Sequence, residues 1–157
     1  MNPDEYGPDY QGHLVEQYKL YVEMADRISH RRALANSFFL ALQTALVGVS
    51  ATALARDDDS GNQSGVLILA GLGIVLAYVW LRVLRSYRQL NSAKFAVVHE
   101  IEAKLPIAPY KLEWDRLGGG ADSEKYTPLT KVEGWVPFVF LVAYVVTAGS
   151  AVLTWAR

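Results

Sequence analysis

The chain contains no cysteine, so it can form no disulfide and offers no thiol nucleophile or thiolate metal ligand. Histidine is scarce as well, and His13, His30 and His99 are not spaced like the ligands of one metal ion. A basic excess is also missing, because 15 lysines and arginines stand against 16 aspartates and glutamates. We therefore expect no metal, no cofactor and no nucleic-acid partner.

Charge is absent from three long blocks, residues 33–55, 65–81 and 135–156. A helix needs about 20 apolar residues to cross a bilayer. The second block reaches this length if Arg82 extends its side chain to the lipid headgroups. A chain of 157 residues is too small to cover three helices that are apolar on every side. The sequence thus predicts an all-α membrane protein with transmembrane helices at about 34–55, 65–83 and 135–156.

Basic residues near the block ends predict the orientation. One side of the membrane receives nearly all of them, and the other receives only Arg56 and Arg157. This asymmetry favours a bacterial inner-membrane protein with a cytosolic N-terminus and an external C-terminus. The expected anchors at the lipid headgroups are Arg31, Arg32, Arg82, Arg85, Trp135 and Trp155.

Apolar residues recur in steps of three and four before the first block and after the second, which is typical of amphipathic helices. The loop between these blocks is short, so the two helices must be antiparallel neighbours. We therefore predict a helical hairpin over residues 13–105, with residues 13–33 and 84–105 forming a cytosolic stalk. The stripes either pack on each other, as in a coiled coil, or bind a partner helix. The stripe residues are Leu14, Tyr18, Tyr21, Ile28, Tyr87, Leu90, Val97 and Ile101.

Outside the hairpin, residues 1–12 are expected to be disordered. Residues 106–134 form a cytosolic return segment with one short helix, which Pro109 opens and Gly118 closes. That helix lies either against the stalk or on the lipid headgroups.

Small residues form a stripe on each transmembrane helix, which lets helix backbones approach closely in lipid. These stripes serve either packing within one chain or a homo-oligomer. Gln43 and Thr44 are possible pore-lining residues, although an amide in lipid also finds partners on a neighbouring helix. The stripe residues are Ala41, Ala45, Gly48, Ala70, Gly73, Ala77, Ala143, Thr147 and Ser150.

We find no set of residues with catalytic spacing and expect no enzyme activity. His99, Glu100 and Glu102 cannot all share one helical face. No ionisable residue falls at mid-depth of the membrane, which argues against active transport.

The stretches YKLYVEMADRISHRRALANSFFL, LRSYRQLNSAKFAVVHEIEAKLP and PYKLEWDRLG resemble a family of uncharacterised bacterial small integral membrane proteins over residues 14–140. Residues 13–105 are also similar in plan to SLATT-type two-pass effector domains, with the pattern R-x-x-A-N-x-F from Arg32 to Phe38. That second resemblance implies pore formation or membrane disturbance in anti-phage and nucleotide-signalling conflict systems.

Two functions remain open from the sequence. The first is a non-enzymatic oligomeric inner-membrane protein whose stalk docks a cytosolic partner or senses a signal. The alternative is a pore-forming or membrane-disrupting effector.

Overall fold

The computed structural model describes residues 3–54, 61–121, 124–127 and 129–155. Every regular element in these ranges is helical, which confirms the predicted all-α class. The elements are α1 (Pro3–Tyr6), α2 (Tyr10–Leu54), α3 (Gly61–Glu102), α4 (Pro109–Arg116), the short 3-10 helix η1 (Gly118–Gly120) and α5 (Leu129–Trp155). Three of them, α2, α3 and α5, are long and apolar enough to cross a membrane.

The chain divides into two compact units. The first, which we call the charged unit, comprises Met1–Arg31 and Tyr87–Pro128. The second, the membrane unit, comprises Arg32–Ser86 and Leu129–Arg157. Both α2 and α3 contribute to each unit, and α2 is a single helix through Arg32 and Ala33. The division falls within a few residues of the points at which the sequence loses its charge.

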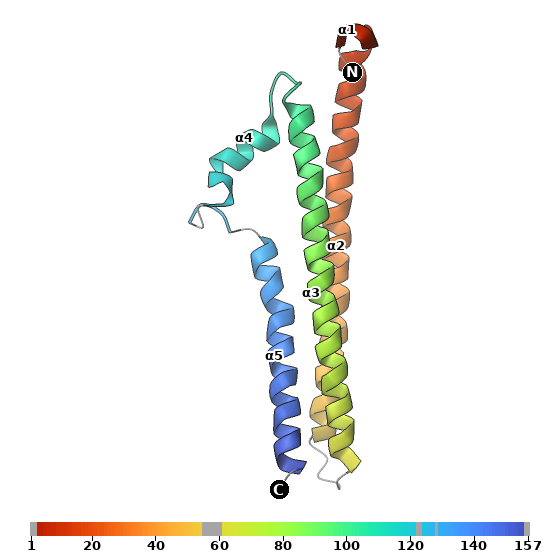
Figure 1. The fold of residues 1–157 in the computed structure, drawn as a ribbon, viewed down its shortest axis with the longest axis vertical. Helices are drawn as coiled ribbons and strands as arrows, with labels where there is room; N and C mark the ends of the chain where they lie inside the picture. The colour runs from red at the N-terminus through yellow and green to blue at the C-terminus, as the bar shows by residue number, and fades with distance from the viewer. Residues whose placement is uncertain (1–2, 55–60, 122–123, 128, 156–157) are drawn as a thin grey trace. The chain divides into compact units, whose positions relative to one another are not determined.

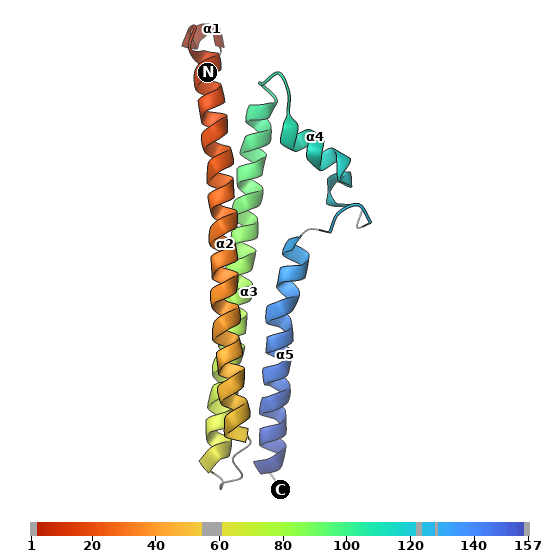
Figure 2. The same ribbon diagram turned by 180° about the vertical axis from the view of Figure 1, so that it is seen from behind.

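In the charged unit, α2 and α3 lie side by side (Figures 1 and 2). Ala25 on α2 and Val98 on α3 are buried between them. Among the predicted stripe residues, Leu14 and Ile28 are buried, and Tyr18, Tyr21, Tyr87, Val97 and Ile101 are partly buried. Leu90 is exposed and does not pack between the two helices, which leaves it the predicted alternative of binding a partner helix. The buried face of α3 is shifted by one position and carries Val98 and Glu102, since hydrogen bonds hold the Glu102 carboxylate inside.

The N-terminal segment is more structured than the sequence predicts. Disorder is expected over residues 1–12, yet α1 and the start of α2 lie in this range. The Tyr6 ring packs edge-on against Tyr10, with 5.8 Å between centroids, and the Tyr6 hydroxyl lies 2.8 Å from Nδ1 of His13. Such local aromatic contacts are not visible in the composition on which the prediction of disorder depends.

Two helix ends also differ from the predicted bounds. Helix α3 ends at Glu102 rather than near 105, and α5 begins at Leu129 rather than 135. Between them, α4 begins at Pro109, and the chain then turns through Gly118, Gly119 and Gly120, whose φ angles are 76°, 62° and 73°. Glycine suits this left-handed region, where other residues are strained.

In the membrane unit, α2, α3 and α5 lie side by side (Figures 1 and 2). The small residues of α3, Ala70, Gly73 and Ala77, are buried there. Those of the other two helices are mostly exposed: Ala41, Ala45, Gly48, Ala143 and Ser150, with Thr147 partly buried. Packing within one chain therefore uses only one of the three predicted stripes.

The predicted headgroup anchors have different environments. Arg31, Arg82, Arg85 and Trp135 are exposed, and the side chain of Trp155 lies outside the described residues. Arg32 is largely covered and pairs with Glu133 on α5, with 3.6 Å between Nε and Oε2.

Candidate functional site

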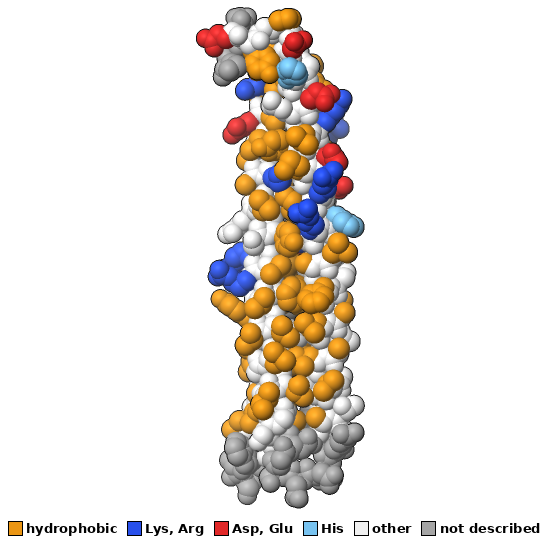
Figure 3. Space-filling model, turned by 90° about the vertical axis from the view of Figure 1, so that its right-hand side faces the viewer, with side chains coloured by type: hydrophobic (Ala, Val, Ile, Leu, Met, Phe, Trp, Pro, Cys, Tyr) orange, Lys and Arg blue, Asp and Glu red, His pale blue; other side chains and the backbone are white. Residues whose placement is uncertain are grey.

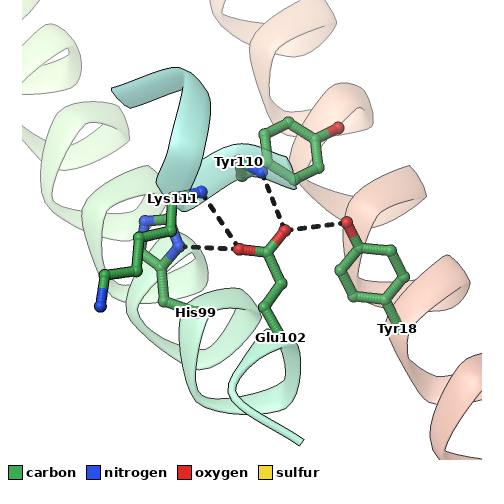
Figure 4. A network of polar contacts seen from close by, with 5 residues as sticks. All are labelled: Tyr18, His99, Glu102, Tyr110 and Lys111. Carbon is green, nitrogen blue, oxygen red and sulfur yellow. Dashed lines mark hydrogen bonds and ion pairs between the residues drawn. The ribbon is translucent and has the colours of Figure 1, made fainter. Parts of the chain in front are cut away.

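A buried carboxylate organises the charged unit. The side chain of Glu102, at the end of α3, has no exposed surface. One of its oxygens accepts hydrogen bonds from the Tyr18 hydroxyl and the Tyr110 N–H, both at 3.0 Å. The other lies 3.2 Å from both the Lys111 N–H and Nδ1 of His99 (Figure 4). We call these five residues the Glu102 cluster; they come from three helices, α2, α3 and α4.

The start of α4 explains why a carboxylate is needed here. A helix N-terminus leaves backbone N–H groups without partners inside the helix. The N-cap residue of α4, Ala108, has no side-chain oxygen that could accept hydrogen bonds from these N–H groups. Glu102 accepts from Tyr110 and Lys111 instead, and its negative charge suits the positive end of the helix dipole. Glu102 therefore caps α4 from another helix and holds it against α3, where Tyr110 also packs on Phe95 at 5.6 Å.

The cluster shifts the pKa of two of its groups. Burial raises the pKa of Tyr18 to about 12, and the hydrogen bond to Glu102 and the charge of Glu102 act in the same direction. Burial by itself would raise the pKa of Glu102, but the hydrogen bonds from Tyr110, His99, Tyr18 and Lys111 outweigh it and lower the pKa below its usual 4.5. Glu102 is therefore ionised and Tyr18 protonated at neutral pH.

This assignment predicts how acid acts on the charged unit. Because the pKa of Glu102 is lowered on folding, its stabilising contribution is present above pH 4.5 and is lost as the pH falls through the folded-state pKa. We expect the protein to unfold at a higher temperature than Glu102→Gln near neutral pH, and the difference to shrink steadily on acidification. Circular dichroism melts of both proteins in detergent, from pH 7 downward, measure it.

The comparison with Glu102→Gln separates this effect from that of the other carboxylates, which are present in both proteins. A temperature difference that is the same at every pH would contradict an ionised Glu102.

In the membrane unit, two buried polar contacts connect the three helices. The Gln43 side chain on α2 donates from Nε2 to the backbone oxygen of Gly73 on α3, at 3.3 Å. The hydroxyl of Tyr144 on α5 donates to the backbone oxygen of Gln43, also at 3.3 Å. Gly73 is essential to this arrangement, because a Cβ at this position would lie 2.5 Å from the Tyr144 ring.

A third polar contact lies two helical turns away from Gln43 and Gly73. The Trp80 indole N–H donates to the Asn36 side-chain oxygen at 2.8 Å. The indole also stacks on Phe39 at 5.8 Å and lies 6.3 Å from Phe140 on α5. Buried hydrogen bonds between helices stabilise membrane bundles by up to about 2 kcal/mol each, so these contacts fix the register of the three helices.

The two predicted pore-lining residues are therefore unlike each other. Gln43 has no exposed surface and faces the interior of a single copy, not a path between copies. Thr44 is exposed, with its hydroxyl bonded to the backbone oxygen of Leu40.

Sequence reasoning missed most of these contacts. It did not place His99 with Glu102, nor assign roles to Asn36, Trp80 and Tyr144. A signal was present: Asn36 and Gln43 are seven residues apart on α2, and Gly73 and Trp80 are seven apart on α3, so each pair shares a helical face. Within the described residues, no group of three or more histidines and carboxylates could hold a metal ion.

Residues 15–153 match the octameric membrane protein family (8xMP). The chain belongs to this family. As an 8xMP member it is an oligomeric, multi-pass membrane protein. Comparison with curated proteins and with solved structures gives no match. The family supports the resemblance to small integral membrane proteins, and no comparison connects this 8xMP chain with SLATT-type domains.

Proposed function

We propose that the protein is a non-enzymatic homo-octamer of the bacterial inner membrane, whose charged unit docks a cytosolic partner or senses a signal. The observation that carries the octamer is the family description together with the exposed small-residue face of α2. Ala41, Ala45 and Gly48 form this face, and nothing lies within 4 Å of a Cβ placed on Gly48. Since small residues allow close approach of helices in lipid, this face suits a neighbouring copy.

The charged unit supports the proposed docking or sensing role. It carries a short helix, α4, whose first turn is capped by the Glu102 carboxylate, and a change at Glu102 would loosen that helix. The N-in, C-out orientation rests on the excess of basic residues on one side of the spanning segments, among them the exposed Arg31, Arg82 and Arg85, over Arg56 and Arg157 on the other.

Particle mass tests the octamer. We expect the protein in nanodiscs to have the mass of eight copies by native mass spectrometry. Gly48→Leu, which fills the small-residue face, should shift the population to smaller particles. Val49→Phe, which enlarges the next and differently directed position on α2, should leave the octamer intact. A monomeric mass for the unmodified protein, or no difference between the two variants, contradicts the proposal.

A pore-forming role is the second candidate, and the exposed hydroxyl side chains Thr44 and Ser150 are groups that an oligomer could place along an axis. Release of a trapped dye from vesicles containing the octamer would favour this role over docking. Intact dye retention with the octamer present would leave docking as the better proposal.

A further inference from the structure

The charged unit has an uncovered apolar surface on α2 and α3. Leu20 is 54% exposed, Met24 37% and Leu90 49%. Figure 3 shows hydrophobic side chains running between charged ones in the charged unit. Lipid accounts for exposed apolar side chains in the membrane unit, but it cannot do so here. The exposed ion pairs Glu16–Lys19 and Glu23–Arg27 on the same stretch of α2 require water.

The helical register places these three residues on one flank of the α2–α3 pair. Nζ of Lys94 lies 5.2 Å from the centroid of the Tyr21 ring, which brings the two helices together at this flank. Leu90 lies one turn before Lys94, and Met24 lies one turn after Tyr21. We call Leu20, Met24 and Leu90 the stalk surface.

This flank is opposite the one that α4 covers. His99 is on the α4 side of α3, because it belongs to the Glu102 cluster. Leu90 precedes it by nine residues, which is a rotation of about 900°, or a net half turn. The stalk surface and α4 therefore lie on opposite sides of the charged unit.

The α4 side has its own exposed apolar residues. Ile107 is 63% exposed and Leu112 44%. Leu112 follows Tyr110 by two residues, about 200° around the helix, so it points away from the Phe95 contact that seats α4 on α3. We call Ile107 and Leu112 the α4 surface.

Two different apolar surfaces on opposite sides are what a ring requires. Copies that share one orientation in a membrane are related by an axis normal to it, and each contact in such a ring joins one surface of a copy to a different surface of the next. The family match spans both surfaces. We propose that the stalk surface of one copy packs against the α4 surface of its neighbour. This inference rests on the proposed homo-octamer and names where the copies meet outside the lipid.

Cysteine crosslinking tests the contact, because the chain has no cysteine of its own. Full-length protein carrying Met24→Cys and Leu112→Cys is oxidised in native membranes with copper phenanthroline and run on a non-reducing gel. We expect a ladder of multimers that a reductant collapses to the monomer. Each single variant should stay monomeric on the gel, since a head-to-tail contact does not bring identical positions together.

The matched control is Asp26→Cys with Leu112→Cys. Asp26 is exposed and lies two residues from Met24, about 200° around α2. An equal ladder from this control, or a disulfide-linked dimer from a single variant, overturns the proposal. The proposal is also overturned if no ladder forms although native mass spectrometry still finds an oligomer. In that case α4 faces lipid or another protein. A monomeric mass for the unmodified chain instead identifies failure of the octamer itself.

Discussion

Gly73→Ala should loosen the membrane unit more than a glycine-to-alanine change at Gly48, Gly65, Gly71, Gly134 or Gly149. The added Cβ would lie 2.5–2.6 Å from three atoms of the Tyr144 ring, which is too close for any contact. The ring must move, and the Tyr144 hydroxyl then loses its hydrogen bond to the backbone oxygen of Gln43. Overpacking of this kind costs about 1–3 kcal/mol, and the lost hydrogen bond adds to it. We expect lower stability in SDS titrations of the protein in mixed micelles, followed by circular dichroism.

Gly71→Ala is the matched control, on the same helix and with the same added methyl. Gly71 is exposed, and nothing lies within 4 Å of a Cβ there. Gly71→Ala should leave the free energy of unfolding unchanged or raise it by up to about 1 kcal/mol, because alanine has the higher helix propensity. Adding Tyr144→Leu to Gly73→Ala should recover part of the loss, because the leucine avoids the ring clash. Equal stability of the two glycine variants would show that α5 does not pack on Gly73.

Glu102→Gln should release α4 from the charged unit. The substitution keeps the size of the side chain but removes its charge and turns one acceptor oxygen into a donor NH₂. One pair of donors then loses its partner, either Tyr18 with Tyr110 or His99 with Lys111. Hydrogen bonds to a charged group contribute about 1.5–3 kcal/mol to stability, and breaking a buried charged contact costs more. We therefore expect the free energy of unfolding to fall by about 2–4 kcal/mol. Hydrogen exchange should rise at the Tyr110 and Lys111 amides.

Glu100→Gln is the control for this result, because Glu100 is exposed and lies two residues away on the same helix. It removes the same charge and should leave exchange in α4 unchanged. Tyr18→Phe should have a smaller effect, about 1 kcal/mol, since it removes one donor and leaves the caps of α4 in place. Unchanged protection of the two α4 amides in Glu102→Gln would mean that another contact holds this helix.

Much of the membrane unit follows from the sequence. Three charge-free blocks predict three spanning helices, because backbone polar groups in lipid must be satisfied within a helix. The breakpoint near Arg32 follows from the loss of charge, and Pro109 marks the start of α4. Leu14 and Ile28, which periodicity assigned to the apolar stripe of α2, are buried in the charged unit.

The stripe on α3 shows where pattern reasoning fails. It follows apolarity and therefore places Val97 and Ile101 at the centre, yet the buried positions are Val98 and the charged Glu102. Periodicity excludes a carboxylate from a core, because burial alone disfavours its charge. Donors from α2 and α4 reverse this preference, and they lie 84 residues before and 8–9 residues after Glu102 in the chain.

The sequence by itself determined which segments are helical and which of them suit lipid, since both depend on local composition and spacing. Only the tertiary structure decided which small residues meet inside one copy, which remain exposed, and that Gln43 is bonded to Gly73 rather than open to a pore. The reason is that lipid makes every apolar face of a spanning helix equally acceptable. A few side chains, Gln43, Trp80 and Tyr144 in the membrane unit and Glu102 in the charged unit, then select one arrangement through partners that lie far away in the sequence.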